Sequence, residues 1–155
     1  MSKKHNESTE VQIRRFLLSD LYDIMQIEDA SYAVDAFSED IFKGLFRECS
    51  DLFLVAEKDD RVIGYMVSCV LPRKAHVISI AVMNSGRRLG VGRRLVEFTF
   101  QQLDSRNIRT VELEVRKSNT AGISFWHELG FTTIDTVPGY YHDGEDALRM
   151  RRVSK

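Results

Sequence analysis

The chain has 155 residues, a formal net charge of −1 and a hydrophobic fraction of 43%. This length fits one domain with a single core, and the composition argues against a disordered chain. No apolar run reaches the ~20 residues of a transmembrane helix, so no membrane association is expected. A nucleic-acid-binding protein usually carries a basic excess, which this chain lacks, so nucleic acid is not expected as a partner.

The first ten residues, MSKKHNESTE, are polar and lack the apolar stretch of a signal peptide. They predict a flexible tail (residues 1–10) before one domain over residues 11–152. Cys49 and Cys69 are too few for a disulfide framework and lack the neighbours of a metal site. We expect them to be buried thiols in a reducing compartment, which indicates a cytoplasmic protein.

The predicted strands lead the chain and then alternate with helices, which indicates an α+β fold. The strands are expected at residues 11–16, 52–57, 62–70, 75–82, 110–115, 131–137 and 147–152. The turn Lys58-Asp59-Asp60-Arg61 joins the second and third strands as a hairpin, and Pro72 ends the third. The strand over residues 75–82 is almost wholly apolar, so it should be central in the sheet.

Helix starts are marked by capping residues. Ser19 is a plausible N-cap for the first helix, with Asp20 favourable in its first turn. Ser38 starts the second helix, where Phe37 and Phe42 have the spacing of a hydrophobic staple. A third helix should run to about Ser105 and a fourth over residues 121–129, with Gly130 as its C-cap.

A glycine-containing turn, Arg87-Arg88-Leu89-Gly90-Val91-Gly92, lies between the central strand and the third helix. Free backbone N–H groups at a helix start attract anions, and glycine allows close approach to a pyrophosphate. The flanking arginines, including Arg93, add positive charge. The pattern is neither a dinucleotide-binding nor a Walker motif. Taken alone, it also fits a plain glycine turn with a solvated arginine face.

A carboxylate interrupts an apolar strand at Glu114, within Val-Glu-Leu-Glu-Val. Alternation places Glu112 and Glu114 on one face. A carboxylate inside a central strand is costly unless it has a partner or a chemical task. His76 opens the strand over residues 75–82, where a lone histidine is often only a surface group.

Five segments share their order and spacing with one enzyme superfamily: HVISIAV, RRLGVG, LEVRKSN, FWHELGF and GYYHDGEDALRM. They resemble the GCN5-related N-acetyltransferases (GNAT), in particular the RimI-type and archaeal-type N-terminal α-acetyltransferases. The resemblance covers about residues 11–152. It implies a GNAT fold, with a mixed sheet of about seven strands, splayed between the fourth and fifth, and about four flanking helices.

The resemblance also implies a reaction: transfer of an acetyl group from acetyl-CoA to the free α-amine of a protein N-terminus, ribosomal proteins included. Glu114 matches the general base, and His76 stands where relatives carry a second base or proton relay. A His–Glu pair has too few ligands for a structural zinc site, so no metal is expected to be required. The residues implied to bind the coenzyme are Ile80, Ala81, Val82, Arg87, Arg88, Leu89, Gly90, Val91, Gly92, Arg93, Asn119 and Trp126.

Trp126 departs from the pattern, because relatives carry a tyrosine there that can protonate the leaving thiolate. Indole cannot act as that acid, so Trp126 is expected to be a wall for the pantetheine arm. Asn119 can cap its helix or bind the coenzyme. By resemblance, a narrow slot for a peptide N-terminus is expected between two loops, lined by Tyr32, Phe37, Tyr140 and Tyr141.

Two other functions stay open at this stage. A small-molecule amine is the first alternative substrate, although no acidic cluster marks the substrate loops. A non-catalytic coenzyme-A-binding module is the second, and the missing tyrosine favours it while Glu114 and His76 argue against it. The sequence leaves open the preferred N-terminal residue and the oligomeric state.

Overall fold

The computed structural model describes residues 10–87 and 89–155. The predicted flexible tail therefore lies outside the described residues except for Glu10, and so does Arg88 of the glycine-containing turn. The strands are β1 (Gln12–Arg15), β2 (Phe53–Lys58), β3 (Arg61–Leu71), β4 (Lys74–Val82), β5 (Thr110–Arg116), β6 (Thr132–Val137) and β7 (Ala147–Val153). The α-helices are α1 (Leu21–Tyr32), α2 (Glu39–Glu48), the short α3 (Asn84–Arg87), α4 (Val91–Asp104) and α5 (Thr120–Glu128).

The strands form one mixed seven-stranded sheet in the order β1-β2-β3-β4-β5-β7-β6. The apolar strand β4 is fourth, so its predicted central position is confirmed. β4 and β5 are parallel and pair from Lys74–Thr110 to His76–Glu112. The paired register ends there, whereas β4 itself continues to Val82.

The contacts divide the chain into two compact units. The first unit comprises residues up to Val67 together with Ser79–Phe98, and the second comprises Ser68–Ile78 together with Thr99–Lys155. β3, β4 and α4 each contribute residues to both units. We describe each unit by itself, and the single domain over residues 11–152 stays a prediction.

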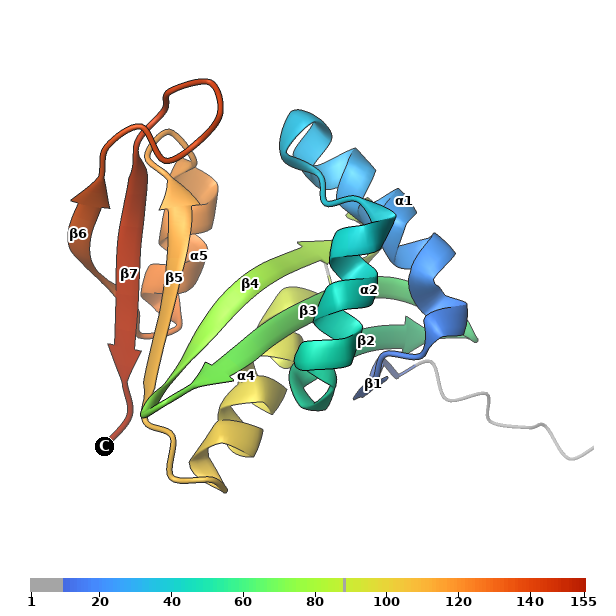
Figure 1. The fold of residues 1–155 in the computed structure, drawn as a ribbon. Helices are drawn as coiled ribbons and strands as arrows, with labels where there is room; N and C mark the ends of the chain where they lie inside the picture. The colour runs from blue at the N-terminus through green and yellow to red at the C-terminus, as the bar shows by residue number, and fades with distance from the viewer. Residues whose placement is uncertain (1–9, 88) are drawn as a thin grey trace, which may run out of the picture. The chain divides into compact units, whose positions relative to one another are not determined.

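The first unit has an aromatic core, with α1 and α2 on the same face of β2 and β3 (Figure 1). The ring centroid of Phe42 on α2 lies 5.6 Å from that of Tyr65 on β3, in an edge-to-face arrangement. Phe16 stacks on Phe53 of β2 at 4.1 Å. All four rings are buried, and aromatic pairs of this kind add to the stability gained from apolar burial.

The hairpin between β2 and β3 has the predicted turn. Asp59 and Asp60 have φ values of 51° and 60°, so both lie in the left-handed region. Two such residues in a two-residue loop are typical of a type I′ turn, whose twist matches that of the strands. β3 ends at Leu71, directly before Pro72, as expected.

One helix start is confirmed and one is wrong. The Ser38 hydroxyl accepts from the Ile41 amide at 3.3 Å, and the Phe37 and Phe42 rings pack with centroids 5.9 Å apart. Ser19 does not cap α1, because it lies inside a 3-10 turn that precedes the helix. Asp20 belongs to the same 3-10 turn, where its buried carboxylate accepts from the Leu17 amide at the start of the turn and pairs with the Arg14 guanidinium.

In the second unit, α5 lies behind β5 and β7 (Figure 1). Its Trp126 contacts Phe131 edge to face, with centroids 5.1 Å apart, and Phe100 packs on Phe131 at 6.1 Å. The Asn119 side chain accepts from the Gly122 amide at 2.9 Å, so its N-cap role is confirmed. Gly130, with φ of 94°, follows the helix end as predicted.

The cysteine prediction is wrong. Cys49 and Cys69 are half-buried, and neither is a free thiol because both are disulfide-bonded. The spacing of two cysteines in a sequence gives no signal for a disulfide bond. Within the described residues, no helix combines the length and the apolar character needed to cross a membrane.

Candidate functional site

The predicted phosphate-binding turn lies in the first unit, between β4 and α4. The Arg94 amide donates to the Gly90 carbonyl, so α4 begins directly after Gly90. The amides of Val91, Gly92 and Arg93 then have no acceptor within the helix, which makes this end suited to an anion. Gly90 has φ of 67°, and a Cβ built on it would meet no atom within 4 Å. The turn therefore leaves open space in front of the helix start.

Two arginines of this turn have partners of their own. The Arg87 guanidinium lies near the Val82 carbonyl, with Nε 3.4 Å from the oxygen. Arg93 donates to Glu97 one helical turn later, at 2.9 Å, and both side chains are more than half exposed. Exposed ion pairs of this type contribute little free energy, so the Arg93 guanidinium can exchange Glu97 for a phosphate. Arg88 lies outside the described residues.

The central strand meets a predicted substrate residue in the same unit. The Tyr32 hydroxyl, at the end of α1, donates to the Ile80 carbonyl. Ala81 is buried, whereas Ile80 and Val82 are partly exposed. The residues predicted to run beside the coenzyme are therefore joined directly to the start of the α1–α2 loop.

A cavity of about 590 Å³ with a mixed polar and apolar lining borders the same turn. α1, the start of β3 and the segment after β4 enclose it. Its lining residues are Tyr22, Asp23, Gln26, Ile27, Ala30, Ser31, Asp60, Arg61, Val62, Val82, Met83, Asn84, Ser85 and Arg87. Since Val82 and Arg87 belong to the predicted coenzyme-binding set, the cavity adjoins that part of the site.

The predicted catalytic pair lies together in the second unit. His76 Nε2 and Glu114 Oε2 are 2.6 Å apart, and Arg149 Nε donates to the other carboxylate oxygen at 3.2 Å. Burial raises the pKa of Glu114, but the hydrogen bonds and charges of His76 and Arg149 outweigh it and bring the pKa below its ordinary value. Glu114 is thus an ionised carboxylate at neutral pH. Its side chain is 8% exposed and that of His76 is 25% exposed, so His76 is the more accessible partner.

Glu112, two residues earlier, has a different environment. Lys74 and Arg151 bind its carboxylate at 3.2 and 2.8 Å, and the hydrogen bond with Arg151 is the main cause of its lowered pKa. Both glutamates of β5 therefore have the partners that a buried carboxylate needs. Of the two, Glu114 is the one bonded to a histidine.

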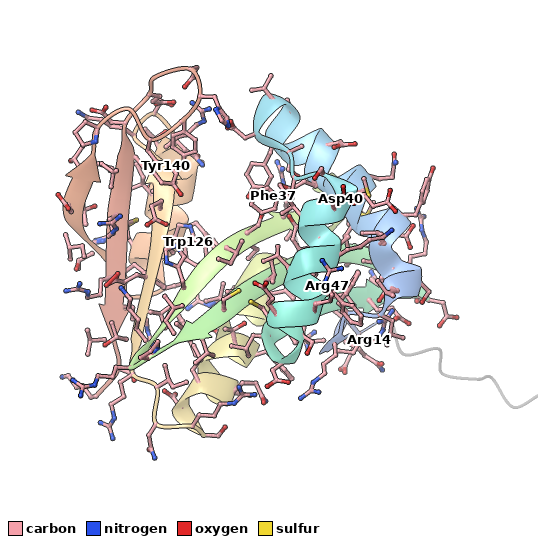
Figure 2. The ribbon with its side chains drawn as sticks, in the orientation of Figure 1. Arg14, Phe37, Asp40, Arg47, Trp126 and Tyr140 are labelled. Atoms are coloured by element: carbon pink, nitrogen blue, oxygen red, sulfur yellow. The ribbon has the colours of Figure 1, made fainter. Side chains whose placement is uncertain are left out.

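The loop that joins β6 to β7, residues 138–146, carries the predicted substrate tyrosines, and we call it the tyrosine loop. The Tyr140 and Tyr141 rings contact edge to face with centroids 5.0 Å apart. Burial raises the pKa of Tyr140, and the negative charge of Glu114 raises it further. The Tyr140 hydroxyl therefore lies within electrostatic reach of the Glu114 carboxylate. Figure 2 labels Tyr140 on this loop and Trp126 on α5, the latter 6% exposed.

The structure thus distributes the predicted residues between the two units. His76, Glu114, Asn119, Trp126, Tyr140 and Tyr141 belong to the second, and the remaining described ones to the first. Sequence reasoning missed Arg116, which binds the tyrosine loop, although its position in LEVRKSN and the acidic run HDGED offered a signal. Among residues 10–87 and 89–155, no group of three His, Cys, Asp or Glu side chains has an arrangement that could hold a metal.

Comparison with known proteins decides the family. The model of the Acetyltransferase (GNAT) family matches residues 17–131. The chain belongs to this family. It is therefore an acetyl-CoA-dependent acetyltransferase, and the predicted GNAT fold is confirmed. The crystal structure of Ard1 from Thermoplasma volcanium superimposes with a TM-score of 0.88 at 28% identity, over 94% of this chain and 98% of that one.

Curated relatives of this GNAT chain include two that cover most of its length. It is 33% identical over 154 residues to an N-alpha-acetyltransferase of Sulfurisphaera tokodaii, which spans 91% of this chain and 92% of that protein. It is also 33% identical over 135 residues to the [ribosomal protein bS18]-alanine N-acetyltransferase of Salmonella typhimurium, across 85% of this chain and 90% of the relative.

Proposed function

We propose that this chain acetylates the free α-amine of protein N-termini, with acetyl-CoA as the donor. The relatives from Sulfurisphaera tokodaii and Salmonella typhimurium carry this activity in their names. The observation that carries the proposal to this chain is the bonded pair of His76 and Glu114, 2.6 Å apart in the second unit. This pair supplies a proton acceptor, which acyl transfer to an amine requires.

The residues of the first unit fit the donor. Acetyl-CoA brings an activated acetyl group as a thioester, together with a pyrophosphate. The amides at the start of α4 and the open space before Gly90 suit the pyrophosphate, and β4 from Ile80 to Val82 offers its main chain to the pantetheine arm. Arg87, Leu89 and Arg93 flank the same turn.

The catalytic pair removes the proton that blocks the amine. A peptide α-ammonium has a pKa of ~7.7–8.0, so only modest assistance is needed near neutral pH. Glu114, held ionised by His76 and Arg149, is the general base, and the more exposed His76 relays the proton to it. The amine nitrogen then bonds to the acetyl carbonyl carbon, and the carbon–sulfur bond breaks with its electron pair leaving on the sulfur. The nitrogen releases its second proton to the thiolate or to water, which gives the neutral amide.

The leaving thiolate needs no acid from Trp126. A thiol of the cysteine type has a pKa of ~8.5, so the thiolate is a tolerable leaving group at neutral pH. Trp126 is 6% exposed and packs on Phe131, which suits a rigid wall. Its indole therefore contributes shape to the coenzyme site.

The family resemblance predicts that four aromatic residues receive the peptide N-terminus. Tyr32 and Phe37 bound the α1–α2 loop within the first unit, and Tyr140 and Tyr141 lie on the tyrosine loop within the second. Flat rings accept an extended main chain, which a free N-terminus can adopt and a lysine on a folded surface cannot. This requirement favours proteins over small amines as substrates.

A pH-dependent kinetic comparison tests the role of the pair. Glu114→Gln keeps the shape of the side chain and removes its charge, so kcat should fall ~10²–10⁴-fold at neutral pH while acetyl-CoA affinity stays. His76→Ala should lose less, because Glu114 remains. Above about pH 9 the amine is deprotonated without help, so both losses should shrink.

Glu112→Gln is the matched control, since Glu112 lies on the same strand and is also bound by cations. It should keep the wild-type kcat. A wild-type rate for Glu114→Gln at neutral pH would place the base elsewhere. A loss that is equally deep at every pH would show that Glu114 only positions the substrate.

The cellular location stays a prediction. A cytoplasmic enzyme would meet newly made N-termini, yet disulfide-bonded cysteines are more typical of an oxidising compartment. Fractionation of the cells that produce the protein tests this expectation, and recovery outside the cytoplasm would contradict it.

A further inference from the structure

Arg116, the last residue of β5, is bound to the tyrosine loop by several contacts. Its Nη1 donates to both carboxylate oxygens of Asp143, at 2.9 and 3.1 Å, and to Glu145 at 2.7 Å. Its guanidinium carbon also lies 4.1 Å from the ring centroid of Tyr141. One side chain thus holds two acidic residues and one aromatic ring of the same loop.

The loop is folded around this arginine. The Tyr141 amide donates to the Glu145 carbonyl at 3.1 Å, and the Gly144 amide donates to the Tyr141 carbonyl at 2.9 Å. The second carboxylate oxygen of Glu145 accepts from the Ser118 amide at 2.9 Å. Arg116 and Ser118 precede α5, so the junction between β5 and α5 anchors the loop on two sides.

This anchoring determines where the tyrosines stand. Arg116 covers one face of the Tyr141 ring, and the Tyr140 ring packs against Tyr141 edge to face. Figure 1 shows the loop arching over the end of β5, the strand that carries Glu114 two residues before Arg116. The side chains of Arg116 and Glu145 are 20% and 25% exposed, whereas that of Asp143 is 58% exposed, so solvent screens the pair with Glu145 less than the pair with Asp143.

We propose that Arg116 is a positioning residue that holds the tyrosine loop in the conformation that receives the peptide substrate. The inference rests on the proposed function, because it assumes that this loop contacts a peptide. Arginine suits the task better than lysine. Its planar fork binds two carboxylates at once while its face stacks on a ring.

Arg116→Met tests the proposal, because methionine keeps much of the length and loses the charge and the fork. Arg151→Met is the matched control, because Arg151 binds a different carboxylate of this unit, that of Glu112. The substrate is an alanine-initiated peptide with a free α-amine. Arg116→Met should raise KM for this peptide by on the order of tenfold and leave KM for acetyl-CoA and kcat within about twofold.

Hydrogen exchange measures the loop itself without relying on activity. The amides of Tyr141 and Gly144 should exchange faster in Arg116→Met than in the wild type or in Arg151→Met. Arg116→Lys should have an intermediate KM for the peptide, because it keeps a charge but not the fork.

Three outcomes would overturn the inference: an unchanged KM for the peptide, an equal rise in KM for both substrates, or unchanged exchange in the loop. Failure of the proposed function would look different. It would show as a wild-type enzyme that leaves the peptide unmodified before any variant is made.

Discussion

A buried carboxyl group on α1 gives the protein a pH-dependent stability. Glu28 is 1% exposed. Its carboxyl group accepts two long hydrogen bonds, from the Phe37 amide at 3.4 Å and from the Ser79 hydroxyl at 3.5 Å. Burial is the main cause that raises its pKa from 4.5 to about 7, and the charge of Asp29 adds to the rise. The folded protein therefore prefers the neutral carboxyl group.

The sign and size of the effect follow from this shift. Because the pKa of Glu28 is raised, its neutral form adds to the free energy of unfolding. This contribution is fully present below the unfolded pKa of 4.5 and is lost as the pH rises through about 7. At 1.36 kcal/mol for each pH unit, the loss amounts to about 3 kcal/mol. Glu28→Gln replaces the carboxyl group with a neutral group of the same shape, so the variant should not lose this stability. At pH 8 it should be more stable than the wild type by up to about 3 kcal/mol.

Urea unfolding of both proteins at about pH 5 and about pH 8 measures the difference, and each kcal/mol should also move Tm by about 2–4 °C. At pH 5 the two proteins should have similar stability. Glu112→Gln is a control that should change the stability in the opposite direction. The ion pairs lower the pKa of Glu112, so removing its charge should destabilise the protein at pH values above the pKa that Glu112 has in the unfolded chain. If the stability difference between Glu28→Gln and the wild type does not grow from pH 5 to pH 8, burial does not destabilise the Glu28 carboxylate and the reasoning fails.

Three further substitutions test separate parts of the site. Gly90→Asp should abolish coenzyme binding, because it puts a carboxylate beside the phosphates, whereas Gly90→Asn tolerates the same φ without charge; unchanged affinity by calorimetry would contradict the assignment. Trp126→Phe should keep most of kcat, since an aromatic wall remains; a loss as deep as that of Glu114→Gln would refute this. Tyr141→Ala should raise KM for peptide much more than KM for acetyl-CoA, and equal effects would indicate a folding defect.

Local patterns predicted the elements well because their causes are local. The apolar strand β4, the hairpin turn at Asp59-Asp60 and the cap at Ser38 each depend on residues close in sequence. The bond between His76 and Glu114 joins residues 38 apart. It was predicted only from the resemblance to the family, since neither residue alone indicates its partner.

What the sequence did not predict depends on distant partners. Ser19 does not cap α1, and the neighbouring Asp20 carboxylate instead binds the Leu17 amide and the Arg14 guanidinium. Arg116 binds Asp143 and Glu145, which lie 27 and 29 positions later in the chain. The almost complete burial of Glu28 on α1 likewise appears only in the structure.

Acetylation of a peptide library varied at its first two positions tests the central claim most directly. The same peptides with a blocked N-terminus and an internal lysine, and a set of small polyamines, serve as comparisons. We predict acetyl transfer to the free α-amine, located by fragmentation in the mass spectrometer, with clear preference among the first residues and little transfer to lysine or polyamines. Efficient acetylation of the small amines with no reaction at peptide N-termini would contradict the account.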